Sequence, residues 1–255
     1  RAALIGYLPS GFPSLSGGIE LALAMVDAGV DIVEVGLPYS DPLMDGPTIQ
    51  AAVDRALAGG STLAHVLETV SAVAATGAPT LVMTYWNPIE RVGPGPFASR
   101  LKSAGGVGVI TPDLTPEEAA DWIAATDAHS LDRVFLVAPS STDERISAVA
   151  AVTTGFVYAA STMGVTGARA SVGTAARELV SRVRALTDLP VAVGLGVSSG
   201  QQAAEVAAYA DGVIVGSAFI ARVLATPDLP SALVAVRELA GELAAGVRGS
   251  RTNAT

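Results

Sequence analysis

The feature that most constrains the fold is a regular alternation of short apolar runs with longer alanine-rich stretches of helical periodicity. Most of the runs are apolar on both faces, which is typical of parallel strands covered by helices. The sequence predicts strands at residues 3–8, 31–37, 80–85, 106–111, 133–138, 155–160, 190–195 and 212–215. It predicts helices at residues 15–28, 52–75, 97–104, 116–125, 143–152, 172–186, 200–209 and 231–245.

Eight such strand–helix units in a chain of 255 residues favour a single-domain (β/α)8 TIM barrel, an α/β fold of this usual size. An open, doubly wound sheet is the alternative, because periodicity alone does not show that a sheet closes. No change of composition marks a second domain. Residues 1–248 are therefore expected to form one catalytic barrel, and the polar residues 249–255 a disordered tail.

Composition excludes several classes of protein. The chain has no cysteine, so disulfides and thiolate chemistry are ruled out. Its net charge is −9 and its 15 basic residues are scattered, which argues against binding to nucleic acid. Glycines and a proline interrupt the long uncharged stretches at 69–89 and 146–168, and the N-terminus lacks the layout of a signal peptide. We expect a cytoplasmic protein that does not enter membranes.

Glu34 is the first candidate for chemistry. It lies in the expected second strand, Asp31–Leu37, on the same face as Ile32 and Gly36. A buried carboxyl group is costly unless it is paired or protonated, so such a site tends to raise the pKa and suits a general acid or base. The alternative is a structural carboxyl group that bonds to the backbone or to a nearby tyrosine.

The loop after this strand, residues 38–48, contains two acids, three prolines and a glycine. In barrels of this kind the reactive groups lie at the carboxyl ends of the strands and in the loops that follow. Asp41 and Asp45 are both candidates, although Ser-Asp-Pro and Asp-Gly-Pro sequences also make good turns. From position alone, either aspartate could serve only the turn.

Two later loops have the composition of an anion site. Residues 194–200 follow the seventh expected strand, and residues 216–218 follow the eighth and open a short helix. Glycines allow backbone N–H groups to approach a phosphate, and a helix N-terminus adds a favourable dipole. A third glycine-rich stretch, residues 161–169, is long enough to cover the site as a lid. Tight turns without a ligand are the alternative.

The remaining residue types limit the mechanism. The only lysine, Lys102, belongs to an outer helix, so a Schiff-base mechanism is disfavoured. His65 and His129 are the only histidines, both in or beside helical segments, and no metal site is expected from them. Carboxyl groups, tyrosines and backbone amides remain. We therefore expect proton transfer without a cofactor on a small phosphorylated substrate.

Several of these segments together resemble the tryptophan synthase α subunit family. The most specific is residues 33–50, Val-Glu-Val-Gly-Leu-Pro-Tyr-Ser-Asp-Pro-Leu-Met-Asp-Gly-Pro-Thr-Ile-Gln. Residues 82–88, 108–118, 164–169, 194–196 and 215–218 support it, so the resemblance runs from the first strand to beyond the eighth. It implies a lyase of tryptophan biosynthesis that cleaves indole-3-glycerol phosphate to indole and glyceraldehyde 3-phosphate by a retro-aldol reaction.

The resemblance also assigns roles to residues. It implies that Glu34 donates the proton to indole C3 and that Asp45 accepts the indole N–H, whereas Asp41 belongs to a partner-facing loop. The implied contacts to the indole and to the pocket wall are Tyr7, Met83 and Tyr85, and Tyr158 corresponds to a substrate-site tyrosine near the catalytic glutamate. The implied phosphate and neighbouring substrate contacts, mostly backbone amides, are Thr166, Gly167, Gly194, Leu195, Gly196, Gly216 and Ser217.

A partner is implied as well. The family pairs with a β subunit that holds pyridoxal phosphate, in an αββα assembly, so no cofactor is expected in this chain. The partner-facing residues would be Asp41, Pro42, Leu43 and Asp113. The family usually has a helix before strand one that covers the barrel's bottom, whereas this sequence starts close to that strand. Alternatives are a free-standing indole-3-glycerol phosphate lyase, another phosphate-binding barrel such as a sugar phosphate isomerase, and a non-catalytic activating subunit.

Overall fold

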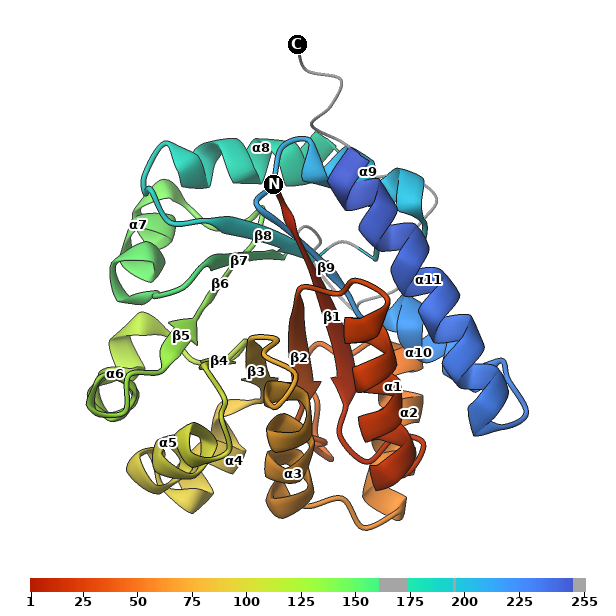
Figure 1. The fold of residues 1–255 in the computed structure, drawn as a ribbon. Helices are drawn as coiled ribbons and strands as arrows, with labels where there is room; N and C mark the ends of the chain where they lie inside the picture. The colour runs from red at the N-terminus through yellow and green to blue at the C-terminus, as the bar shows by residue number, and fades with distance from the viewer. Residues whose placement is uncertain (161–173, 195, 250–255) are drawn as a thin grey trace.

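The parallel strands form one curved sheet that is surrounded by helices, as a computed structural model of the chain shows (Figure 1). The structure describes residues 1–160, 174–194 and 196–249. Neighbouring strands follow the order β5-β4-β3-β2-β1-β9-β8-β7-β6, and every pairing is parallel. The strands are β1 (Ala3–Pro9), β2 (Ile32–Gly36), β3 (Thr80–Met83), β4 (Gly108–Ile110), β5 (Asp132–Val134), β6 (Leu136–Val137), β7 (Val157–Ala160), β8 (Val191–Gly194) and β9 (Gly212–Val215).

The two ends of this sheet belong to one stretch of chain. β5 and β6 are separated by a single residue, Phe135, so the sheet is a nearly closed barrel whose edges are joined by the backbone. The expected fifth strand, 133–138, is thus present as two short pieces, and the barrel rather than the open sheet is confirmed. Phe135 itself is 1% exposed and packs in the main core.

The helices cover the outside of the barrel (Figure 1). Most expected helices are confirmed within a few residues, but 52–75 is wrong as a single helix, because Gly59 and Gly60 end the first part and Gly60 has φ +80°. The stretch 116–125 is likewise divided into a 3-10 turn and a helix, and the helix that begins at Trp86 was not expected. In the described part of the chain, no helix is long and apolar enough to cross a membrane. The helical segments are α1 (Leu15–Asp27), α2 (Pro47–Ala58), α3 (Leu63–Ala74), α4 (Trp86–Val92), α5 (Pro94–Ser103), η1 (Pro116–Glu118), α6 (Ala120–Ala128), α7 (Asp143–Val152), α8 (Thr174–Arg184), α9 (Gly200–Ala207), α10 (Ser217–Leu224) and α11 (Leu229–Gly249).

Alternating side chains along each strand divide the apolar residues into two layers. One set, which includes Val33, Val82 and Val213, packs against the helices in the main core. The other set points into the barrel, where Ile5, Ala192 and Ile214 form one cluster and Leu81, Ile110 and Val134 form a second. We call these two interior clusters the apolar floor of the barrel.

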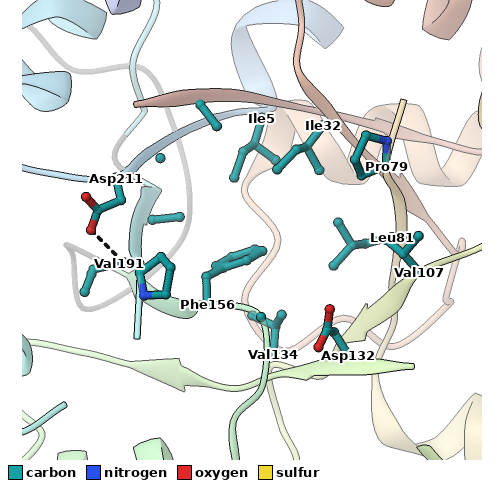
Figure 2. Close-up of a pocket in the computed structure, with 15 residues that line it drawn as sticks. Ile5, Ile32, Pro79, Leu81, Val107, Asp132, Val134, Phe156, Val191 and Asp211 are labelled. Carbon is teal, nitrogen blue, oxygen red and sulfur yellow. Dashed lines mark hydrogen bonds between the residues drawn. The ribbon is translucent and has the colours of Figure 1, made fainter. Parts of the chain in front are cut away.

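The apolar floor faces a cavity of about 280 Å³. This cavity lies at the opposite end of the barrel from the loops that follow the strands, such as residues 38–48. Residues just before strands line it, such as Pro79 and Pro190, which places it at the amino ends of the strands. Figure 2 shows Ile5, Ile32 and Phe156 converging on this space, with Asp211 at its edge. Parallel-barrel chemistry is located at the carboxyl ends, so we do not assign the reaction to this cavity.

The close packing of α9 on α11 requires glycine at position 246. A Cβ atom on Gly246 would overlap the carbonyl oxygen of Gly200 and lie 2.7 Å from its carbonyl carbon, whereas one on Gly241 of the same helix would meet nothing within 4 Å. We expect Gly246→Ala to lower the free energy of unfolding by about 1–3 kcal/mol through overpacking. We expect Gly241→Ala to be neutral or to stabilise the helix by up to about 1 kcal/mol. Urea unfolding of both variants checks this, and equal midpoints would contradict it.

Candidate active site

Glu34 is in the middle of β2 and points into the barrel. It lies two residues beyond Ile32, whose side chain packs against both interior clusters, and it pairs in register with Tyr7 of β1 and Leu81 of β3. The next inward position on β2 is Gly36 at the end of the strand. The carboxyl group therefore stands just below the carboxyl-end rim of the barrel, which is where the sequence predicted it.

The environment of Glu34 favours the protonated form. Its exposure is 0%, and neither carboxyl oxygen has a hydrogen-bond partner among the described residues. Burial raises its pKa from 4.5 to about 8, because the charged form loses its hydration. The structure therefore gives no support to a structural carboxyl group held by the backbone or by a tyrosine, and a group with this pKa can donate or accept a proton near neutral pH.

The buried Tyr7 and the half-buried Tyr158 stand beside this carboxyl group, and each one packs against glycine. A Cβ on Gly36 would lie 2.5 Å from the Tyr7 hydroxyl, and a Cβ on Gly216 would lie 3.0 Å from the Tyr7 ring. The Tyr158 hydroxyl similarly covers Gly194. Burial raises the pKa of both phenols, and the negative charge of Glu34 raises each of them further. Both hydroxyls therefore stay protonated and form polar walls around Glu34.

Asp45 is in the loop after β2 and is held from two sides. The Tyr85 hydroxyl lies 3.1 Å from Asp45 Oδ1, and the Gln50 side-chain amide donates to the Asp45 carbonyl oxygen at 2.6 Å. Burial raises the pKa of Asp45, whereas the hydrogen bond from Tyr85 lowers it by stabilising the carboxylate. The aspartate that the resemblance selected is thus the one fixed next to the barrel's tyrosines.

The other loop acid, Asp41, has a different setting. It is exposed and accepts a hydrogen bond from the neighbouring Ser40 hydroxyl at 2.6 Å. Leu43, in the same loop, is 74% exposed, which is unusual for a large apolar side chain. Pro42 lies between them and is half-buried. Asp41 and Leu43 therefore face solvent.

Asp113 was expected to be a partner-facing residue, and the structure adds a contact within the chain. Both of its carboxylate oxygens accept the backbone N–H of Trp86, at 2.9 and 3.1 Å. Trp86 is the first residue of α4 and directly follows Tyr85. Asp113 thus fixes the start of α4, and with it the backbone next to Tyr85.

The expected anion cup is partly described. Gly194 ends β8, which pairs with β9, and Gly216 follows β9 as the N-cap residue of α10. Gly196 has φ +65°, a left-handed conformation that favours glycine. Ser217 is the first residue of α10, so backbone N–H groups of a helix N-terminus lie next to the ends of β8 and β9. Thr166, Gly167 and Leu195, and the expected lid at 161–169, lie outside the described residues.

The lysine and the two histidines belong to helices outside the barrel. Lys102 is on α5, where its ammonium group donates to the Ser130 carbonyl oxygen at 3.0 Å. His65 is on α3 and His129 ends α6. Among the described residues no three His, Asp or Glu side chains are grouped as metal ligands would be.

Two contacts of the site were not anticipated. The sequence placed Tyr85 on the pocket wall, but its hydroxyl bonds to Asp45 and to the Met44 N–H. The hydrogen bonds from the Trp86 N–H to the Asp113 carboxylate were not predicted either. Neither contact leaves a signal in sequence spacing, because each joins loops that follow different strands.

The whole barrel matches one family model. Residues 1–248 fit the model described as tryptophan synthase alpha chain. Curated relatives include the tryptophan synthase alpha chain of Thermobifida fusca, 60% identical over 98% of this chain and 94% of that one. The tryptophan synthase alpha chain of Streptomyces coelicolor is also 60% identical, over 98% of this chain and 92% of the other.

Solved structures agree with these relatives. A structure of Mycobacterium tuberculosis tryptophan synthase superposes with a TM-score of 0.91 at 56% identity, covering 97% of this chain and 93% of that one. A chain of the tryptophan synthase a2b2 complex from Pyrococcus furiosus, described there as mutually activating, superposes with a TM-score of 0.87 at 32% identity. That alignment covers 94% of this chain and 97% of the other.

Proposed function

The chain belongs to the tryptophan synthase alpha chain family, and on this premise we propose that Glu34 and Asp45 carry the chemistry of its reaction. The chain is a lyase of tryptophan biosynthesis that cleaves indole-3-glycerol phosphate to indole and glyceraldehyde 3-phosphate. The family match excludes the sugar phosphate isomerase, and it favours the synthase subunit over a free-standing lyase. The assignment of residues within this reaction is our proposal.

The observation that carries the proposal is the burial of Glu34. A carboxyl group with a pKa of about 8 and no internal hydrogen-bond partner among the described residues holds a proton that it can transfer. Glu34 gives this proton to indole C3, which becomes tetrahedral while the ring nitrogen becomes cationic. The bond from C3 to the glycerol carbon then breaks, and its electron pair returns to the ring. The hydroxyl on that carbon loses its proton to Glu34 and becomes the aldehyde.

Asp45 stabilises the charge that forms between these two steps. As a carboxylate it accepts the indole N–H, and its negative charge opposes the positive charge on the ring nitrogen. Such a group accelerates the reaction because the charge it stabilises develops on the path to cleavage. Tyr85 supports the carboxylate form, because its hydroxyl donates a hydrogen bond to Asp45.

The rest of the site binds the substrate. Tyr7, Met83 and Tyr158 are on the inner face of the barrel and would enclose the indole. The backbone amides of Gly194, Gly196, Gly216 and Ser217 would hold the phosphate, since glycines and a helix N-terminus suit an anion. Thr166, Gly167 and Leu195 belong to the same proposed substrate site.

We also propose that this chain uses no cofactor of its own and works with a β subunit that carries pyridoxal phosphate, in an αββα assembly. The exposed Asp41 and Leu43 and the half-buried Pro42 between them would contact that subunit, as would the loop that contains Asp113. The Pyrococcus furiosus neighbour is a subunit of an a2b2 complex, which supports such an assembly. The cytoplasmic location remains a prediction.

Indole formation from indole-3-glycerol phosphate tests the function and the partner together. We expect slow release of indole by the chain alone and faster turnover when a tryptophan synthase β subunit is added, because the partner would order the loops that surround the site. Indole is measured by absorbance or by chromatography. The same rate with and without the β subunit would contradict the partnership, and no indole under either condition would contradict the assignment of the reaction.

A further inference from the structure

The Tyr85 hydroxyl connects two consecutive residues of the loop after β2. It accepts a hydrogen bond from the Met44 backbone N–H at 3.2 Å and lies 3.1 Å from Asp45 Oδ1. A carboxylate can only accept, so the single phenolic proton goes to Asp45 and a lone pair receives the Met44 N–H. One hydroxyl thus fixes both the backbone and the reactive side chain of this loop.

Tyr85 is itself held by its surroundings. It is 6% exposed, and its ring packs against Tyr39 at 5.6 Å between centroids. The next residue, Trp86, is bound through its N–H by the Asp113 carboxylate. The loops after β2, β3 and β4 are thereby joined in one chain of contacts that ends at Asp45.

We propose that Tyr85 is a positioning residue for the cleavage reaction, and that its hydroxyl keeps Asp45 oriented and ionised for the indole N–H. This inference rests on the proposed function of Asp45. It assigns to Tyr85 an action through Asp45, in place of the direct substrate contact that the resemblance implied. Asp113 contributes by fixing the backbone that follows Tyr85.

The charges around Asp45 determine the direction of the expected effect. Burial raises its pKa, and the Tyr85 hydroxyl lowers it. Among the described residues, the other titratable groups near Asp45 and Tyr85 are Glu34 on β2, Tyr7 on β1, Tyr158 on β7 and Tyr39 in the loop after β2. Glu34 and Asp45 each add negative charge there when ionised. Without the Tyr85 hydroxyl the pKa of Asp45 must rise, so the fraction of ionised Asp45 at a given pH must fall.

The test is Tyr85→Phe, which removes one oxygen and keeps the ring. We expect kcat to fall roughly 10- to 100-fold, as for the loss of a hydrogen bond to a charged group, with a small change in KM. We expect the acid limb of the kcat profile to move to higher pH. The matched control is Tyr39→Phe, which removes a hydroxyl from the other member of the ring pair and should leave both kcat and the profile unchanged.

A measurement that does not use turnover separates this inference from the proposed function. The Asp45 carboxyl carbon can be titrated by NMR in aspartate-labelled protein, with Asp45→Asn to assign its signal. We expect the Asp45 pKa to be higher in Tyr85→Phe than in the unmodified chain or in Tyr39→Phe. An unchanged Asp45 titration would overturn the role of Tyr85, whatever the rates. If the unmodified chain releases no indole, the proposed function fails, while the titration still decides whether Tyr85 holds Asp45.

Discussion

Replacement of Glu34 by glutamine is expected to lower kcat for indole release by about 100- to 10,000-fold, the range found for general acid–base groups. The amide has nearly the same shape and still fills the buried position on β2, but it cannot transfer a proton to indole C3. The dissociation constant of the substrate should change little, because the proposed phosphate and indole contacts remain. Steady-state kinetics and equilibrium binding of the substrate to the inactive variant measure the two effects separately.

The same replacement should make the protein more stable at neutral pH. In the unfolded chain Glu34 loses its proton near pH 4.5, whereas in the folded chain it keeps it until about pH 8. Because the folded chain holds this proton and the unfolded chain does not, the free energy of unfolding of the wild type falls as the pH rises from 4.5 to about 8. Above pH 8 the loss is complete. Glutamine removes that loss, so the advantage of the variant should be near zero below pH 4.5 and roughly 3 kcal/mol at pH 7.

Urea unfolding at several pH values checks this expectation. Glu20→Gln is the control, since Glu20 is exposed on α1 and the same chemical change there affects no buried carboxyl group. Near-normal turnover in Glu34→Gln would exclude Glu34 as the acid. A variant without the neutral-pH gain in stability would show that the buried carboxyl group is not held protonated.

The Asp45→Asn variant should lose about 100- to 1,000-fold in kcat, similar to the loss of other groups that stabilise a developing charge. Asparagine can still accept the indole N–H through its amide oxygen, but it has no negative charge to oppose the cationic ring nitrogen. The fold should be retained, because Asp45 is only half-buried and burial already raises the pKa of its carboxyl group.

Comparison with Asp54→Asn isolates the effect of charge at the site. Asp54 is exposed on α2, the helix that follows the loop containing Asp45, so this change removes one negative charge close by in sequence but outside the barrel. We expect normal kcat in Asp54→Asn, and we expect Asp54→Asn and Asp45→Asn to have matching thermal unfolding curves. Equal rates for Asp45→Asn and the wild type would leave Glu34 as the only acidic group in the mechanism.

Much of the barrel could be predicted because its signals are local. A parallel strand covered on both faces is apolar at consecutive positions, and this pattern located β2, β8 and β9 to within a few residues. The errors have local causes too. The helix expected at 52–75 is broken by Gly59 and Gly60, and the expected fifth strand is interrupted at Phe135. Gly59 and Gly60 were a local signal of a helix end that the prediction of one helix overlooked, whereas Phe135 lies within an apolar run and marks no interruption there.

The site was predictable to a different degree for each residue. Glu34 was conspicuous as a carboxyl group within an apolar strand, and its complete burial followed from that position. Asp45 could not be separated from Asp41 by position, and only the resemblance to a family distinguished them. The hydrogen bond from Tyr85 to Asp45 spans 40 residues, and that from Trp86 to Asp113 spans 27. Pairings at such separations depend on how the strands close.

The sequence by itself determined the order of strands and helices, the fold class and the restriction to carboxyl groups, tyrosines and amides. These follow from residue chemistry and short-range periodicity, which need no knowledge of distant contacts. Only the tertiary structure decided which groups meet at the barrel mouth and how strongly each is desolvated. Closure of the sheet brings together loops after three different strands, and it removes water from Glu34. The pKa of Glu34 and the hold of Tyr85 on Asp45 are therefore properties of the closed barrel, not of any segment.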